Sequence, residues 1–213
     1  CSIKRNSIMF FNRLSLLSFV VLLVMACGPS EAQQSSDQIT TASGYTPEIN
    51  PNPGAPVQIV KFSDYQCPAC KFFVPIEQKI KEDYGDQVSI VTKHFPLSMH
   101  PYAHVASRSA EVARKQGKYK EMHDKIFEGQ EVWSKGNAER LFIGYAEEIG
   151  LDTEVFTADM NSAEMNQIVM EQRKEGVRMG VNATPTFYIN GIKVENNPQT
   201  YMGFKVLIDR ELD

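Results

Sequence analysis

The sequence predicts an α/β domain that begins near Val57, and three observations lead to this fold class. Residues 57–62 form an apolar run typical of a buried strand, and a Cys-Pro-Ala-Cys segment and apolar residues at helical spacing follow it. Helical periodicity then fills the middle of the chain, from about residue 102 to residue 178. After Gly180 the pattern indicates two short strands joined by a tight Asn190–Gly191 turn.

The first 27 residues have the pattern of a lipoprotein-type signal peptide. An almost unbroken apolar run over 14–25 follows basic residues, and at about a dozen residues it is shorter than the roughly 20 that span a bilayer. The run ends Val-Met-Ala-Cys-Gly, which is similar to the bacterial lipoprotein signal, so we expect Cys27 to carry acyl chains and anchor the chain to a membrane. The alternative is an ordinary secretory signal in which Cys27 is incidental. Since residue 1 is Cys, we expect translation to start at Met9.

Residues 28–56 predict a tether. They are rich in Ser, Gln, Thr, Pro and Gly and lack apolar periodicity, so we expect a disordered segment whose last part, 47–56, lies along the domain surface. The remaining 57–213 is long enough for one folded domain. The chain has a net charge of −4 and no basic stripe, which argues against nucleic acid as a partner.

The first half of the domain reads as strand, helix and strand. Pro68 suits the first turn of a helix over 68–84, which ends at Gly85 and which Pro75 should kink. The residues expected to face inward from this helix are Phe72, Phe73, Ile76 and Ile80. Residues 88–95 predict a second strand.

Five helices and a hairpin are expected next. The helices cover about 102–116, 118–128, 137–149, 152–159 and 162–178, and the expected caps of the last three are Asn137, Asp152 and Ser162. Strands at 186–189 and 192–194 form the hairpin, and Asn197 with Pro198 opens a final helix.

Cys67 and Cys70 are the candidate catalytic residues. The chain has four cysteines, and because Cys1 and Cys27 lie in the leader, the domain keeps a single pair that can open and close a small disulfide ring. At a helix N-terminus the thiol of Cys67 should have a pKa well below the free value of about 8.5. We expect substrate thiolates to attack the exposed sulfur of Cys67, and a shielded Cys70 to resolve the mixed disulfide.

Two metal-binding alternatives are open to this pair. A zinc site would need two further ligands, and the histidines offer metal-type spacing only at His100 and His104. A non-catalytic Cu(I) carrier would use the two soft thiolates alone. We expect no metal and no cofactor, since the methionines and these two histidines have ordinary structural explanations.

Four segments together resemble the DsbA-like branch of the thioredoxin superfamily. They read Asp-Tyr-Gln-Cys-Pro-Ala-Cys-Lys-Phe-Phe over 64–73, His-Phe-Pro-Leu over 94–97, Gly-Lys-Tyr and Met-His-Asp within 117–124, and Gly-Val-Asn-Ala-Thr-Pro-Thr-Phe over 180–187. The resemblance covers about 57–210. It implies a thioredoxin fold with a helical insertion, about 99–178, between the second strand and the hairpin.

The resemblance also implies a substrate-docking edge. Pro185 should be cis and lie beside the two cysteines, and the backbone of Thr184 should pair with an extended substrate segment. Pro68 and Ala69 should line the same site. The alternative is that Pro185 merely begins its strand in the trans form.

Lys61 departs from the family pattern. Many thioredoxin-like proteins have a carboxylate six residues before the first cysteine, where this chain has Lys61. Lys61 is therefore a candidate for tuning the thiol pKa in favour of the thiolate, unless its side chain reaches solvent. Asp64, at a strand end, is expected to face water.

These features predict an exported, lipid-anchored thiol–disulfide oxidoreductase. In DsbA-like proteins the usual direction is donation of a disulfide to unfolded or newly exported proteins, and the family implies a membrane redox partner that restores the disulfide. A reductase or isomerase is the alternative within this chemistry. Because residues 28–56 offer no dimerisation domain, we expect a monomer in the periplasm or cell envelope.

Overall fold

The computed structural model describes residues 50–213. The predicted signal peptide, Cys27 and most of the predicted tether lie outside the described residues. The elements in chain order are β1 (Val57–Ser63), α1 (Pro68–Tyr84), the short 3-10 helix η1 (Gly85–Gln87), β2 (Val88–His94), α2 (Ala103–Lys115), α3 (Tyr119–Glu128), α4 (Gln130–Trp133), α5 (Ala138–Glu148), α6 (Thr153–Met160), α7 (Ala163–Arg178), β3 (Thr186–Ile189), β4 (Ile192–Lys193) and α8 (Tyr201–Leu212).

The sheet has the strand order β2-β1-β3-β4. β1 and β2 run parallel in a register that pairs Val57 with Val88 and Ser63 with His94, whereas β3 and β4 are antiparallel to their neighbours. The β3–β4 turn is tight because Asn190 and Gly191 both adopt positive φ angles, of 48° and 80°, as the Asn-Gly pair predicts. The α/β fold class and this strand, helix, strand and hairpin order are confirmed.

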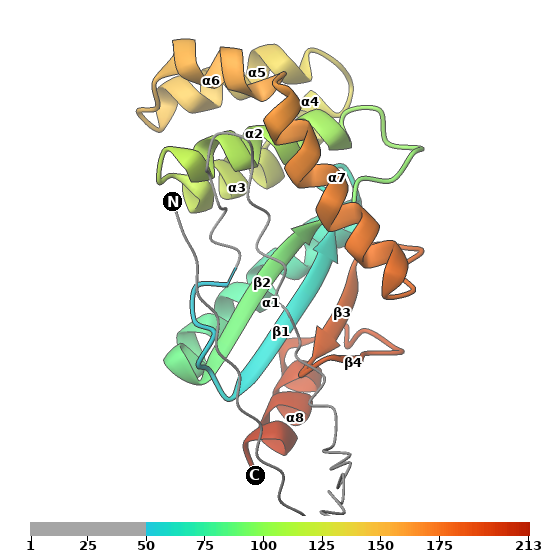
Figure 1. Cartoon of the computed structure of the whole chain (residues 1–213). Helices are drawn as coiled ribbons and strands as arrows, with labels where there is room; N and C mark the ends of the chain where they lie inside the picture. Colours follow the sequence, from blue (N-terminus) through green and yellow to red (C-terminus); the bar gives the residue numbers. More distant parts are fainter. Residues whose placement is uncertain (1–49) are drawn as a thin grey trace, which may run out of the picture. The chain divides into compact units, whose positions relative to one another are not determined.

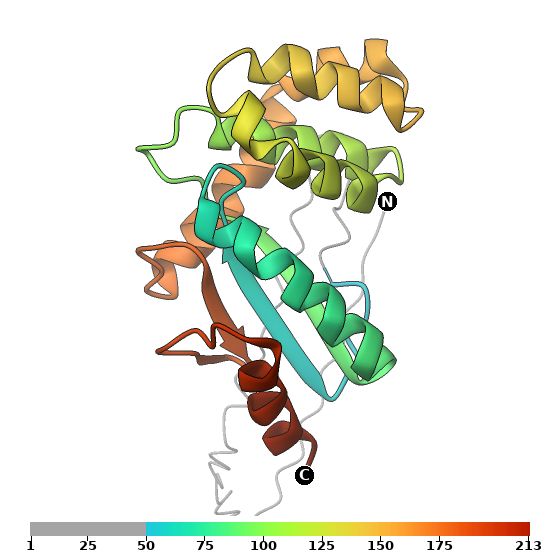
Figure 2. The same cartoon turned by 180° about the vertical axis from the view of Figure 1, so that it is seen from behind.

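One face of the sheet packs against α1 and α8, which lie in front of it in Figure 2. The buried residues of this layer come from three strands and both helices: Val57, Ile59, Phe73, Ile80, Val88, Ile90, Phe187, Ile189, Phe204 and Ile208. Helix α7 crosses the opposite face, where Gly176 lies against Phe62 and Phe95 (Figure 1). The sheet is therefore a middle layer, as its alternating buried residues require.

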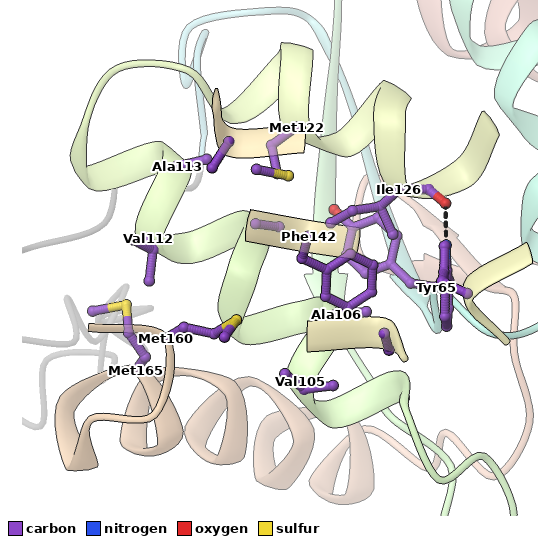
Figure 3. Packing of buried hydrophobic residues seen from close by; sticks show 14 of the residues in the cluster. Tyr65, Val105, Ala106, Val112, Ala113, Met122, Ile126, Phe142, Met160 and Met165 are labelled. Carbon is purple, nitrogen blue, oxygen red and sulfur yellow. Dashed lines mark hydrogen bonds between the residues drawn. The ribbon is translucent and has the colours of Figure 1, made fainter. Parts of the chain in front are cut away.

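The predicted insertion is confirmed as the helices α2 to α7, between β2 and β3. Helices α2 to α6 lie beyond the end of the sheet toward which β1 and β2 point (Figure 1). They have a core of their own, which includes Phe142, Met160 and the fully buried Trp133. Tyr65, two residues before Cys67, packs into this core (Figure 3).

The structure corrects three local expectations and adds one short helix. Phe72 is half exposed, because the buried stripe of α1 consists of Cys70, Phe73, Glu77 and Ile80. Asn137 holds the expected N-cap position in a left-handed conformation, but its side chain caps nothing. The final helix begins at Tyr201, with the Thr200 hydroxyl accepting from the Gly203 N–H, rather than at Asn197. The four-residue helix α4 was not expected.

Residues 50–56 lie against the domain, as expected for the end of the tether. Asn50 donates to the Gln58 side chain at 2.8 Å and accepts from the Ser89 hydroxyl at 2.7 Å. Ala55 is buried. Within residues 50–213 no helix has both the length and the apolar character that crossing a membrane demands.

Candidate active site

Cys67 is the last residue before α1, at the end of the sheet that faces the insertion. Its backbone is extended, and Pro68 occupies the first turn of the helix, where a missing N–H costs nothing. Both cysteines are free thiols. Cys70 is fully buried, as expected, but Cys67 is only 7% exposed, so the expectation of an exposed sulfur holds only relative to Cys70.

The two thiols have opposite pKa shifts. The pKa of Cys67 is lowered to about 5, chiefly by a hydrogen bond from the Cys70 thiol and with help from the backbone N–H groups of Ala69 and Cys70. Burial raises the pKa of Cys70 well above its ordinary value, and the neighbouring Cys67 adds to this shift. Near neutral pH the pair therefore holds one thiolate at Cys67 and one proton at Cys70, the arrangement that thiol–disulfide exchange uses.

The loop before β3 reaches this pair from far along the chain. The Thr184–Pro185 peptide bond is cis, so the expectation is confirmed and the trans alternative is wrong. The carbonyl oxygen of Thr184 lies 3.4 Å from Cys67 Sγ. Two side chains brace the loop: the Thr186 hydroxyl donates to the Ala183 carbonyl, and Asn197 donates to the Pro185 carbonyl, each at 2.8 Å.

Pro68, Ala69 and the cis-proline loop surround Cys67 on the accessible side. Pro68 and Ala69 are exposed, and Thr184 is half-buried. The geometry thus brings together Cys67, Thr184 and the buried Pro185 as the sequence predicts, next to the exposed residues Pro68 and Ala69.

Lys61 lies under the site with no access to solvent. It follows Val57 and Ile59 on the face of β1 that α1 covers, and its ammonium group pairs with the Glu77 carboxylate of α1 at 2.5 Å. The alternative in which Lys61 reaches solvent is therefore wrong. The positive charge of Lys61 partly offsets the burial that raises the pKa of Cys70.

Asp64 is buried too, so the expectation that it faces water is wrong. Its carboxylate accepts from the Gln66 and Leu97 backbone N–H groups and from the His100 imidazole. These partners come from the active-site loop and from the segment before α2. A strand-end position alone does not reveal that the next loop folds back over it.

The insertion contacts the active-site loop and the end of β2 through side chains that the sequence mostly did not single out. The Gln130 amide of α4 donates to the Tyr65 carbonyl at 2.6 Å and to the Cys67 carbonyl at 3.0 Å. At the end of β2, His94 contacts the buried Glu111 of α2 at 2.8 Å. Of the side chains of Gln130, His94 and Glu111, only His94 could be noticed in the sequence, as part of the His-Phe-Pro-Leu segment.

The histidines considered as metal ligands have other partners. His100 contacts Asp64, and the imidazole of His104 lies 3.3 Å from the Met170 sulfur. Over residues 50–213 no group of three or more His, Cys, Asp or Glu side chains is placed to hold a metal ion.

Known proteins share this fold. A family model described as thioredoxin matches residues 49–210. The structure of oxidised BdbD from Bacillus subtilis is 26% identical with a TM-score of 0.67, over 76% of this chain and 90% of that chain. A thioredoxin-like oxidoreductase from Silicibacter pomeroyi is 27% identical with a TM-score of 0.65, over 76% and 92%. Wolbachia pipientis alpha-DsbA1, 22% identical with a TM-score of 0.65 over 75% and 87%, shares the fold.

Curated relatives match one part of longer proteins. The Na(+)/H(+) antiporter NhaA 1 of Mycobacterium sp. (strain KMS) is 34% identical over 146 residues, which are 67% of this chain and 23% of that protein. The NhaA of Herminiimonas arsenicoxydans is 30% identical over 67% of this chain and 22% of its own length. The chain thus spans less than a quarter of these relatives, and their antiporter name describes the whole proteins. Because the family model matches most of its length, the chain belongs to the thioredoxin superfamily, and a thioredoxin-like oxidoreductase is among its structural neighbours.

Proposed function

We propose that this chain is an exported thiol–disulfide oxidase that passes the Cys67–Cys70 disulfide to thiols of unfolded or newly exported proteins. A substrate thiolate attacks the Cys67 sulfur, the Cys67–Cys70 bond breaks, and the electron pair leaves on Cys70, which takes up a proton. A second substrate thiolate then attacks the mixed disulfide and leaves with a disulfide, and Cys67 remains as a thiolate.

One observation carries the oxidase direction: the lowered pKa of Cys67, about 5. A stable thiolate favours the reduced enzyme, and a stabilised reduced form makes a dithiol pair a stronger oxidant. Cys67 is then the nucleophile when the enzyme is reduced and the attacked sulfur when it is oxidised. Cys70 is the leaving group or the resolving thiol.

The exposed residues Pro68 and Ala69, with the half-buried Thr184 beside Cys67, support a docking role for the cis-proline loop. An extended substrate segment would pair with Thr184, whose carbonyl already points to the Cys67 sulfur, and would pass over Pro185, Pro68 and Ala69. Main-chain pairing of this kind accepts many sequences, which suits an enzyme acting on unfolded clients.

The equilibrium with glutathione tests the direction. We expect the Cys67–Cys70 couple to have a potential clearly above the about −270 mV of thioredoxin, and insulin reduction to be slower than the oxidation of a reduced, unfolded client. A potential at or below that value would favour a reductase. Stoichiometric copper in the purified protein, with no turnover, would favour a metal carrier instead.

The apolar leader and Cys27 support a location outside the cytoplasm, with acyl chains holding the chain to a membrane and a membrane redox partner restoring the disulfide. Incorporation of labelled palmitate into the full chain, and its loss in Cys27→Ser, tests the anchor. Size-exclusion chromatography with light scattering tests the expected monomer. A label that remained in Cys27→Ser would contradict the anchor at Cys27.

A further inference from the structure

Asp64 contacts both cysteines through its own backbone. Its N–H donates to Cys70 Sγ at 3.4 Å, and its carbonyl oxygen accepts from the Cys67 N–H at 3.1 Å. Asp64 comes directly after β1, so this backbone is the point at which the strand leads into the active-site turn.

The side chain of Asp64 fixes the orientation of that backbone. The carboxylate is completely buried, with the Gln66 N–H at 2.7 Å and the Leu97 N–H and His100 Nδ1 at 2.8 Å. Three donors that converge on one buried carboxylate leave it a single orientation, because a buried acceptor that loses its donors is penalised. The carboxylate therefore ties the active-site turn to the segment that leads into α2.

Negative charge gathers on Cys70 Sγ in both directions of exchange. When a thiolate attacks the Cys67 sulfur of the oxidised pair, the electron pair of the broken bond goes to Cys70. In the reverse step Cys70 must be a thiolate before it attacks Cys67 and releases the substrate thiolate. Burial opposes this charge, so a backbone donor fixed at the sulfur stabilises the transition state, as donors do in an oxyanion hole.

We infer that the Asp64 N–H is a catalytic contact to Cys70, and that the Asp64 carboxylate with His100 forms the positioning pair that holds it there. The inference rests on the roles proposed above for Cys67 and Cys70. It concerns the exchange step itself, so it applies whether the enzyme oxidises or reduces its clients.

The resolution step isolates this role. The reduced full chain is mixed with saturating oxidised glutathione, quenched with acid at successive times, and analysed by intact mass for the Cys67–glutathione mixed disulfide. Attack by Cys70 then forms the Cys67–Cys70 disulfide and releases glutathione. The variants are Asp64→Ala, His100→Ala and His100→Asn, whose amide can donate from the position of Nδ1. His104→Ala, four residues further along the chain in α2 and in contact with Met170 instead, is the matched control.

Asp64→Ala and His100→Ala should slow resolution by about tenfold or more, so that the mixed disulfide accumulates, since a displaced donor loses much of the roughly 100-fold or more that a fixed donor to a developing charge contributes. His100→Asn should recover most of the rate, and His104→Ala should match the wild type. Alkylation of Cys67 at pH 7 should stay within about threefold in every variant, because a thiol with a pKa near 5 is already ionised there.

Resolution within about twofold of the wild type in His100→Ala would overturn the inference, and so would equal losses in resolution and in Cys67 alkylation, which indicate general disorder of the site. His100 is partly exposed, which keeps the test decisive if Asp64→Ala fails to fold. Failure of the proposed cysteine roles gives a different result, since the wild type would then not resolve the mixed disulfide at all.

Discussion

At the residue scale, the two cysteines differ because one thiol donates to the other. The Cys70 thiol is the largest cause of the lowered pKa of Cys67. We expect the rate of iodoacetamide alkylation of the reduced protein to rise with pH with a midpoint near 5. Cys70→Ala should move this midpoint upward because it removes the donor, whereas Cys70→Ser keeps a hydroxyl donor and should move it less. A wild-type midpoint near the free value of about 8.5 would contradict the proposed thiolate.

The Lys61–Glu77 pair leads to a second prediction at this scale. Both groups are buried, so Lys61→Met leaves an uncompensated carboxylate and should lower the free energy of unfolding by about 3–5 kcal/mol in urea denaturation. The double variant Lys61→Met with Glu77→Met should recover most of that loss. Lys79→Met, which breaks an exposed pair on the same helix, should change the free energy of unfolding little. A double variant no more stable than the single one would argue against pairing as the cause.

Burial of the Lys61–Glu77 pair could have been predicted from the sequence, whereas burial of Asp64 could not. Lys61 shares strand alternation with Val57 and Ile59, and Glu77 falls four residues after Phe73 on the buried stripe of α1, so both could have been assigned to the interior. Asp64 could not, because its partners at Leu97 and His100 come from a loop whose path depends on the whole fold.

At the element scale, helix α7 approaches the sheet closely through a glycine. A Cβ on Gly176 would lie 2.6 Å from the Phe95 ring and 2.9 Å from the Phe62 ring, both buried. Gly176→Ala should therefore lower the free energy of unfolding by about 1–3 kcal/mol, as overpacking does. Gly144→Ala in α5 meets no atom within 4 Å and should be neutral or stabilising by up to about 1 kcal/mol through helix propensity. Equal effects of the two substitutions in thermal or urea denaturation would contradict this view of the packing.

Helix starts were predicted best where the N-cap side chain forms hydrogen bonds with the first turn of the helix. Asp152 and Ser162 begin α6 and α7 with side-chain hydrogen bonds, as expected. The N-cap of α8 is Thr200 and not Asn197, because the Asn197 side chain donates its hydrogen bond to the Pro185 carbonyl. Helix α4 has one turn, too short for a periodic signal, yet it carries Gln130 to the active-site loop.

At the scale of the whole molecule, the insertion and the sheet meet at the reactive cysteine. Gln130, His94 and Glu111 cross this boundary with buried hydrogen bonds, and Tyr65 continues the insertion core to within two residues of Cys67. The order of elements followed from patterns along the chain, and the insertion and the cis-proline loop followed from the family resemblance. These cross-boundary contacts did not, since each joins residues of ordinary local pattern that only the fold makes neighbours.

The lowered pKa of Cys67 also links the stability of the molecule to its redox state. In the unfolded reduced chain the thiol has its free pKa of about 8.5, and in the folded one it has a pKa of about 5. A depressed pKa stabilises the folded state fully above the unfolded value, and that contribution is lost as the pH falls through the folded value. The oxidised protein has no such group, so only the reduced form gains stability between about pH 5 and pH 8.5.

We therefore expect the melting temperature of the reduced protein to exceed that of the oxidised protein at pH 8, and the difference to shrink steadily toward pH 5. The disulfide closes only a small ring, so its constraint on the unfolded chain offsets only part of this gain at pH 8. Calorimetry of both redox forms between pH 4.5 and 8 measures the difference directly. Cys67→Ala, which has no thiolate, should follow the pH dependence of the oxidised form. A difference in melting temperature that is constant across this range, or that favours the oxidised form at pH 8, would mean that the Cys67 thiolate does not stabilise the reduced protein.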